Sequence, residues 1–274
     1  MSDVLIRSAT AADYAAFAQL QPELATQDPV PTEAVWRQDY VADALVAERR
    51  GKVVGYLIGQ TLADTGYVRN VVSARAVRRT GVGRALLLAF RERIVAEGKT
   101  SWRLNVKLDN TPAVKLYESF GMKFAWDSMA IRLAWADVTR LPESPRELQA
   151  HEVPAEADAE VERALNLPFG LVDSVRTKAG RVLKRLSHPG GKCAGFAAFD
   201  PAFPGAYPFA VALPLYARAL FEALRPHARK GDPEIQVVAD GDGGLAELLL
   251  KAGGVEKLRF AHFSGSLAAS AAPR

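Results

Sequence analysis

Hydrophobic residues fall along the chain in short β-branched runs and in longer stretches where they recur three and four positions apart. The first pattern is typical of buried strands and the second of amphipathic helices. The clearest example is Tyr67–Leu87, where a β-branched run at 68–72 precedes a basic segment and Gly81-Val82-Gly83. From Val82 onward, apolar or small residues occupy positions 82, 85, 86, 89 and 90. This stretch therefore predicts a strand, a glycine-containing turn and a helix.

The same patterns predict the remaining elements of the first half. Strands are expected at 4–7, 44–48, 53–61, 101–108, 123–126 and 128–135, and helices through Tyr14, Phe17 and Leu20, from Thr32, and from Thr111. Pro112 suits the first turn of the last helix, with Thr111 as its N-cap, and Gly121 suits its end. Strands and helices thus alternate, which is typical of an α/β or α+β fold.

The second half has similar signals. Helices are predicted at 153–165 and 216–228, strands at 181–186, 192–199, 206–213 and 234–239, and a short helix followed by strands in the sequence that ends the chain. Residues 141–145, Leu-Pro-Glu-Ser-Pro, suit neither helix nor strand. We therefore expect a linker at 139–147 between two domains.

Composition and charge exclude several classes of protein. With 274 residues, 49% hydrophobic and 24% charged, the chain is typical of a globular protein of about two domains. Its net charge of +4 arises in residues 1–140 and is too small for a nucleic-acid binder. Cys193, the single cysteine, excludes an internal disulfide and is expected in the core, and the four histidines lack metal-ligand spacing. We expect a cytoplasmic protein that does not bind a metal or a membrane.

The turn after the central strand has the properties of an anion site. The first N–H groups of a helix lack partners within it and lie at the positive end of its dipole. Glycine at 81 and 83 allows close approach to that backbone, and Arg78, Arg79 and Arg84 add positive charge. Leu86 occupies the third glycine position of a dinucleotide motif, and no Gly-Lys-Ser/Thr follows, so a phosphate site of another kind is indicated.

Two motifs in order carry a resemblance. Arg78-x-x-Gly81-x-Gly83 resembles the pyrophosphate loop of the GCN5-related N-acetyltransferases (GNAT), and NVKLDNTPAVKLYESFGMKF, residues 105–124, resembles the closing half of their signature. Met122 departs from the usual phenylalanine. The resemblance implies a mixed, mostly antiparallel sheet flanked by helices, with acetyl-coenzyme A as the acetyl donor.

The resemblance also implies roles for residues. Backbone groups around Val71, Val72 and Ser73 would pair with the pantetheine arm; the cofactor's other contacts would come from Arg78, Arg79, Thr80, Gly81, Val82, Gly83, Arg84, Asn110 and Ala113. Tyr117 corresponds to the tyrosine that protonates the departing thiolate, although its ring would also pack beside Leu116. Asn105 stands where many ribosomal-protein acetyltransferases carry a glutamate base; it cannot take a proton, which argues against a protein N-terminus as acceptor. Asp64, Asp39 and bulk water remain open as routes for the proton.

The acceptor region is expected at residues 21–40. Trp36 and Tyr40 would line it, unless they pack under the sheet edge. Arg69 and Asn70 on the central strand would face the same pocket, and an arginine there suits an acceptor with a carboxylate. We expect a small-molecule primary amine.

The order of elements in the second half repeats that of the first, which predicts tandem domains: a GNAT domain at 1–138 and a degenerate GNAT-like domain at 148–274. Ala212-Leu213-Pro214-Leu215 replaces the glycine motif, and the tyrosine position falls in apolar Leu248–Leu250. The second half is therefore not expected to bind coenzyme A. Three functions remain: an N-acetyltransferase, acting as a monomer or homodimer; a coenzyme A-binding sensor or adaptor without turnover; and plain nucleotide binding.

Overall fold

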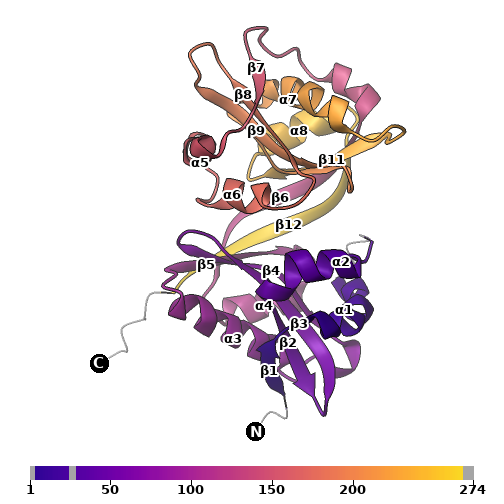
Figure 1. Ribbon diagram of the computed structural model, residues 1–274, viewed down its shortest axis with the longest axis vertical. Coiled ribbons are helices and arrows are strands. Elements are labelled where there is room, and N and C mark those ends of the chain that lie inside the picture. The colour runs from indigo at the N-terminus through magenta and orange to yellow at the C-terminus, as the bar shows by residue number, and fades with distance from the viewer. Residues whose placement is uncertain (1–3, 25–28, 268–274) are drawn as a thin grey trace. The chain divides into compact units, whose positions relative to one another are not determined.

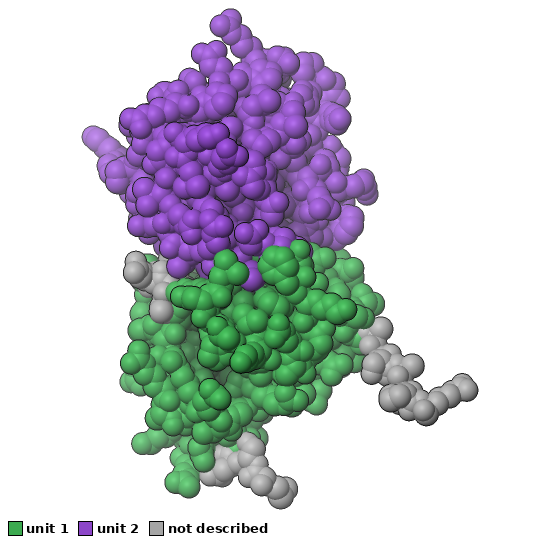
Figure 2. Space-filling view, turned by 180° about the vertical axis from the view of Figure 1, so that it is seen from behind, with its two compact units in different colours: residues 1–125, 262–274 green, residues 126–261 purple. Residues whose placement is uncertain are grey.

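The structure is a computed structural model that describes residues 4–24 and 29–267. The chain divides into two compact units (Figure 2). Unit 1 contains residues 1–125 and 262–274, and unit 2 contains residues 126–261. Both boundaries fall inside strands, β6 (Lys123–Ala134) and β12 (Val255–Ser266). Each of these two strands therefore contributes residues to both units.

Unit 1 opens with strands and helices close to those that the sequence predicts (Figure 1). These are β1 (Leu5–Ser8), α1 (Tyr14–Leu20), α2 (Glu33–Val35), β2 (Ala44–Arg49) and β3 (Lys52–Thr61). The predicted start of the second helix is confirmed, since the Thr32 hydroxyl accepts the Val35 N–H at 3.4 Å. The helix then continues as a π turn, Trp36–Tyr40.

The central part of unit 1 consists of β4 (Thr65–Ser73), α3 (Val82–Ala96), β5 (Ser101–Lys107) and α4 (Thr111–Glu118). The predicted succession of strand, turn and helix is confirmed. Strand β4 is antiparallel to β3 and parallel to β5. Helix α4 is capped one residue earlier than predicted, because the Asn110 side chain, rather than that of Thr111, accepts the Ala113 N–H at 3.3 Å.

Helix α3 lies close against the sheet because glycines stand beneath it. A Cβ at Gly59 would lie 2.1 Å from Cε2 of Phe90, and a Cβ at Gly66 would lie 2.5 Å from Cδ1 of Ile94. Phe90 and Ile94, the two α3 residues that face these glycines, are fully buried. The sequence thus fixes how near α3 lies to β3 and β4, and with it the place of the turn that precedes the helix.

Unit 2 contains the larger part of β6 and β12 together with the remaining elements (Figure 1). These are β7 (Gln149–Glu152), α5 (Asp158–Ala164), α6 (Leu171–Arg176), β8 (Val182–Ser187), β9 (Cys193–Asp200), β10 (Gly205–Val211), α7 (Ala217–Leu224), β11 (Glu234–Asp240) and α8 (Gly243–Lys251). The six residues of α6 were not predicted, because so short a helix gives no periodic signal. Cys193 is buried, as expected. Within the described ranges, no helix has the length and apolar character that crossing a membrane requires.

Several of the predicted boundaries are wrong. The helix expected at 216–228 ends at Leu224 and is followed by a 3₁₀ turn, Arg225–His227, and the strands expected after α8 are the single strand β12. The strands expected at 123–126 and 128–135 form one strand, β6: residues 128–134 pair continuously with β11, and the Gly241 N–H donates to the Asp127 carbonyl at 3.1 Å. The helix expected at 153–165 covers only 158–164, because Pro154 and a 3₁₀ turn at Ala155–Ala157 precede it.

The predicted repeat is present. In unit 1, β2, β3, β4, α3, β5 and α4 follow one another as β8, β9, β10, α7, β11 and α8 do in unit 2. In each half the third strand is parallel to the fourth, whereas the strands before it are antiparallel. The expected mixed and mostly antiparallel sheet, flanked by helices, is therefore confirmed.

The strands that close the two units are exchanged. Strand β6, which follows α4 in sequence, pairs with β11 in unit 2. Strand β12, which follows α8, lies next to β5 in unit 1, and just beyond it the Leu267 N–H donates to the Thr100 carbonyl at 2.8 Å. Residues 139–147, the predicted linker, lie inside unit 2, where Leu141 is buried.

Candidate functional site

The candidate site begins where β4 and β5 part. Their pairing runs from Thr65 with Ser101 to Val68 with Leu104 and ends there, although β4 continues to Ser73. A register shift against β3 falls at the same place, opposite Ile58 and Gly59. In an antiparallel pair, every second residue directs its N–H and C=O away from the partner strand. Residues 69–73 therefore present backbone groups to the gap that β5 leaves.

The turn before α3 directs further backbone donors to this region. Gly81 is the N-cap of α3 and has a left-handed φ of +91°, which glycine adopts without strain. The first hydrogen bond of the helix joins the Ala85 N–H to the Gly81 carbonyl at 2.9 Å. The N–H groups of residues 81–84 thus lie outside the helical ladder. A Cβ on Gly83 would be only 3.5 Å from Leu116 and 3.9 Å from Val71, which brings α3, α4 and β4 together.

The arginines around this turn have different surroundings. Arg78 donates to the Glu23 carboxylate at 2.6 Å, and Arg75 donates to the same oxygen at 3.2 Å. Arg84 donates to the Ser119 hydroxyl at 3.1 Å, with its guanidinium 5.1 Å from the centre of the Phe120 ring. Arg79 is exposed and has a positive φ of 69°. Thr80 donates its hydroxyl proton to the Val77 carbonyl at 2.7 Å. Glu23 and Ser119 were not predicted, because only the fold brings them to the turn.

Tyr117 lies on α4 with its side chain almost wholly buried, 7% exposed. Burial raises the pKa of its phenol to about 12, because the phenolate would lose its hydration. Among the residues that the structure describes, none forms a hydrogen bond with its hydroxyl. The side chain is thus a protonated donor at neutral pH, with its hydrogen-bonding capacity unused by the described part of the chain.

The residues predicted to bind the acceptor lie on the face of the sheet that α1 covers, opposite the face against which α3 packs. Side chains alternate along β5, so half-buried Asn105 faces the same side as Arg103, whose register partner is Tyr67. Asn70, also half-buried, pairs with Ile58, which belongs to the core under α1. The Arg69 guanidinium lies 5.8 Å from the centre of the Tyr40 ring. Arg69, Asn70, Asn105 and Tyr40 are thus brought to one face.

Trp36 is placed differently. Its side chain is 0% exposed, stacks on Phe17 at 4.4 Å between ring centres and donates to the Thr10 carbonyl at 3.2 Å. Trp36 therefore belongs to the hydrophobic core, which was the alternative interpretation of this residue. Asp64, the residue before β4, is seven residues from Val71, about 23 Å along the strand.

The order of these elements agrees with known proteins. The profile of the Acetyltransferase (GNAT) family matches residues 13–122. The L-amino acid N-acetyltransferase AaaT of Escherichia coli is 35% identical over 147 residues, covering 45% of this chain and 85% of that protein. The chain belongs to the GNAT family.

Two other relatives match shorter regions of this chain. An N-alpha-acetyltransferase of Sulfurisphaera tokodaii is 32% identical over 100 residues, which cover 31% of this chain and 59% of that protein. An L-2,4-diaminobutyric acid acetyltransferase of Nocardia farcinica is 28% identical over 86 residues, covering 30% of this chain. The chain spans only 45% of the length of this second relative.

Solved structures share the fold of the whole chain. A putative acetyltransferase from Pyrococcus horikoshii has a TM-score of 0.72 at 14% identity, covering 97% of this chain and 90% of that one. A tandem GNAT protein from the clavulanic acid biosynthesis pathway has a TM-score of 0.60 at 19% identity, covering 97% and 99%. The second half is therefore a GNAT-like fold as well.

The equivalent turn in unit 2 differs from the GNAT turn of unit 1. No glycine precedes α7; a 3₁₀ turn, Pro214–Tyr216, stands there instead. The Ser144 hydroxyl accepts the Ala219 N–H at 3.1 Å and donates to the Leu215 carbonyl at 2.8 Å. A side chain of the protein thus occupies part of the place that an anion would take. Leu249, seven residues after the N-cap of α8, is 0% exposed where Tyr117 stands in α4.

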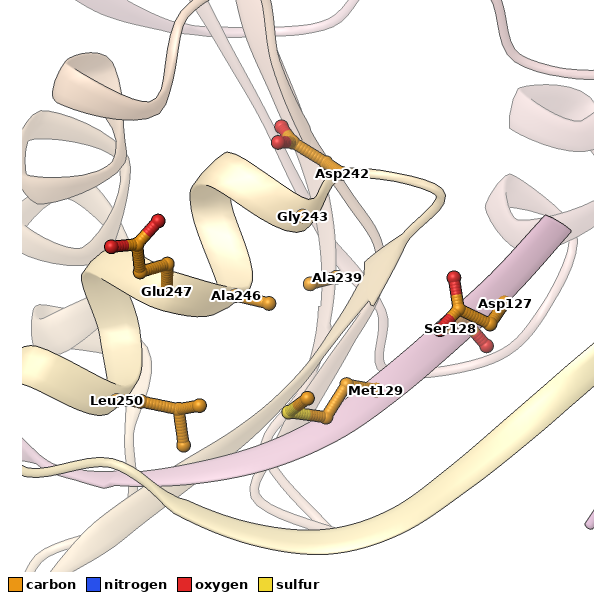
Figure 3. Close-up of a pocket in the computed structure, with 9 residues that line it drawn as sticks. All are labelled: Asp127, Ser128, Met129, Ala239, Asp242, Gly243, Ala246, Glu247 and Leu250. Carbon is orange, nitrogen blue, oxygen red and sulfur yellow. The ribbon is translucent and has the colours of Figure 1, made fainter. Parts of the chain in front are cut away.

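Unit 2 also contains a hollow of about 240 Å³ between β6, β11 and α8 (Figure 3). Three carboxylates line it, but each has a partner. Asp242 accepts the Leu245 N–H at 2.8 Å, Glu247 pairs with Lys251 at 2.7 Å, and Asp127 lies 3.8 Å from Arg259. Two of these carboxylates thus face a cationic side chain, and the third caps the first turn of α8.

Proposed function

We propose that the chain is an acetyl-coenzyme A-dependent N-acetyltransferase that acts on a primary amine of a small molecule. The observation that carries this proposal is the unpaired edge of β4 at residues 69–73, next to the N–H groups of residues 81–84. A linear amide-containing arm that ends in a pyrophosphate fits this combination, because it pairs like a strand at one end and binds a helix N-terminus at the other. Membership of the GNAT family supports the same ligand.

The proposed roles of the donor-binding residues follow from their placement. The backbone of Val71, Val72 and Ser73 holds the pantetheine arm, and N–H groups at residues 81–84 bind the pyrophosphate. Arg79 and Thr80 approach the same group from the turn, while Asn110 and Ala113 contact the arm at the start of α4. Acetyl-coenzyme A, when bound, would supply an acetyl group activated as a thioester.

Tyr117 is proposed to assist departure of the thiol. As the amine nitrogen bonds to the acetyl carbon and the carbon–sulfur bond breaks, the sulfur gains an electron pair, which a phenol hydrogen bond stabilises. With a phenol pKa of about 12, complete transfer of the proton to a thiolate of pKa near 8.5 is uphill by roughly 5 kcal/mol. The Tyr117 hydroxyl therefore acts first as a hydrogen-bond donor, and solvent completes the protonation.

Removal of the amine proton is assigned to solvent. Asn105 stands at the position of the glutamate base and cannot accept a proton from an ammonium group. It is half-buried, and its amide can orient the acceptor or a water molecule. The rate is then expected to rise with pH as the fraction of neutral amine rises.

The names of two relatives support a small acceptor. One is an L-amino acid N-acetyltransferase and the other an L-2,4-diaminobutyric acid acetyltransferase. The name of the third, an N-alpha-acetyltransferase, does not specify a small molecule. Asn105 favours the small-molecule acceptor over a protein N-terminus.

A second candidate is a coenzyme A-binding sensor without turnover, which the absence of a carboxylate at residue 105 favours. The deciding experiment is calorimetric titration of acetyl-coenzyme A into the folded protein, followed by thiol release with a panel of amines. Binding with amine-dependent thiol release supports the transferase. Binding without release from any amine supports the sensor, and failure to bind contradicts both.

A further inference from the structure

Arg69, on β4 of unit 1, has no partner of opposite charge among the residues that the structure describes. It is half-buried and is the first residue of β4 beyond the last pair with β5, Val68 and Leu104. Among the described residues no carboxylate forms an ion pair with it, whereas Arg7, Arg78 and Arg93 of the same unit each have one.

The position of the Arg69 side chain is fixed by its neighbour. Its guanidinium carbon lies 5.8 Å from the centre of the Tyr40 ring, and Tyr40 itself packs against Phe17 of the core. Cation–π attraction to an aromatic ring orients a guanidinium group. It leaves the N–H groups at the edge of the guanidinium free to donate hydrogen bonds. That edge matches a carboxylate, which accepts two parallel hydrogen bonds.

The surroundings favour an anion over a cation. Arg69 is half-buried, and a partly desolvated guanidinium that no carboxylate of the described residues pairs with is costly to leave uncompensated. An acceptor that brings its own negative charge offsets this cost, and a polyamine does not.

The distance from the proposed acetyl site limits the kind of acceptor. Arg69 is two residues from Val71, about 7 Å along the strand, and Val71 belongs to the edge proposed to hold the thioester. The carboxylate must then lie within a few bonds of the reacting amine. We infer that Arg69, supported by Tyr40, selects acceptors with a carboxylate close to the amine, as in free amino acids. This inference rests on the proposed function and names the acceptor class of that site.

The test compares matched acceptors. The ratio of kcat/KM for L-phenylalanine, L-methionine and L-2,4-diaminobutyrate to that for each decarboxylated amine is measured in the wild type, Arg69→Gln and Arg91→Gln. Arg91→Gln, on α3, removes the same charge outside the site. We expect the ratio to exceed one in the wild type and to fall roughly 10- to 100-fold in Arg69→Gln, the size of one lost charged hydrogen bond. Arg91→Gln should keep the wild-type ratio.

The inference is overturned by a wild-type ratio of one or less, and equally by equal ratios in the wild type and Arg69→Gln. Phosphoethanolamine tests the same site for a phosphate, and its preference over all three amino acids also contradicts the carboxylate assignment. If no amine is acetylated, the proposed function fails, and calorimetric titration of the three amino acids with coenzyme A present still tests Arg69. A heat of amino-acid binding that is measured with the wild type but not with Arg69→Gln supports a carboxylate-binding role of Arg69. Equal heats in the two proteins, or no heat in either, contradict this role.

Discussion

Arg84 Nη1 donates a hydrogen bond of 3.1 Å to the hydroxyl oxygen of Ser119. Arg84 lies in the first turn of α3 and Ser119 is the C-cap of α4, so the contact joins the proposed anion site to the helix that carries Tyr117. The Ser119 hydroxyl in turn donates to the Leu116 carbonyl at 2.6 Å. Arg84 therefore holds two helices together with its side chain, while its backbone N–H remains available to an anion.

Loss of this contact should lower turnover more than cofactor binding. Ser119→Ala removes the acceptor for Arg84 without altering the turn before α3, so we expect kcat to fall roughly 3- to 10-fold. The Kd for acetyl-coenzyme A should stay within about twofold, because no proposed cofactor ligand is changed. A urea double-mutant cycle with Arg84→Met should give a coupling free energy of about 1 kcal/mol. A coupling near zero would show that the two side chains do not support each other.

Tyr117→Phe should lower kcat at neutral pH by roughly 10²- to 10⁴-fold, since it removes the side-chain hydrogen-bond donor proposed for the leaving thiolate. The Kd for acetyl-coenzyme A, measured by calorimetry, should change little. Unchanged turnover would remove the assignment of Tyr117. The variant is valid as a test only if its unfolding transition matches that of the wild type.

The raised pKa of Tyr117 makes a separate prediction about stability. The folded-state pKa of about 12 exceeds the unfolded value near 10. As pH rises from 10 to 12, the unfolded chain loses this proton first, and the wild type should lose up to about 2.7 kcal/mol of unfolding free energy relative to Tyr117→Phe. Tyr56, whose pKa burial also raises, is present in both proteins and cancels in the difference. A difference that stays constant up to pH 12 would mean that the Tyr117 hydroxyl is hydrated.

Two glycine substitutions should separate packing from binding. Gly59→Ala places a Cβ 2.1 Å from the Phe90 ring, so we expect a loss of roughly 1–3 kcal/mol in the free energy of unfolding, or more. Gly83→Ala meets its nearest atom at 3.5 Å and should leave that free energy unchanged or slightly higher. It should nevertheless weaken acetyl-coenzyme A binding about tenfold, since the methyl group covers the N–H groups. Urea unfolding and calorimetry, applied to both variants, check these outcomes.

The exchanged strand predicts that the first half is not independent as a fragment of residues 1–138. Such a fragment lacks residues 262–267, which cover the free edge of β5, and should unfold at lower urea concentration or aggregate. Adding a peptide of residues 255–267 should restore the transition in part, whereas a peptide of the same composition in scrambled order should not. A fragment as stable as unit 1 in the whole chain would contradict this role of β12.

Much of the site was predictable because its determinants are local in sequence. The turn at residues 78–83 needs only glycine, a preceding strand and a following amphipathic helix, and all three were evident. Arg69 and Tyr40 were predicted for one pocket, and they lie together. Trp36 was predicted either to line the acceptor pocket or to pack in the core. Because its side chain is fully buried, it belongs to the core. Periodicity cannot distinguish an apolar residue that lines a pocket from one beneath it.

By itself, the sequence determined the order of the elements, the glycine-containing turn before α3 in the first half and its replacement in the second, since these depend on backbone propensities and on glycine. Only the tertiary structure decided that Glu23 binds Arg78, that Ser144 caps α7, and that β12 rather than β6 lies beside β5. These contacts join residues far apart in the chain. The physical reason is that they depend on which edges and helix ends the folded chain brings together, and no local pattern records that.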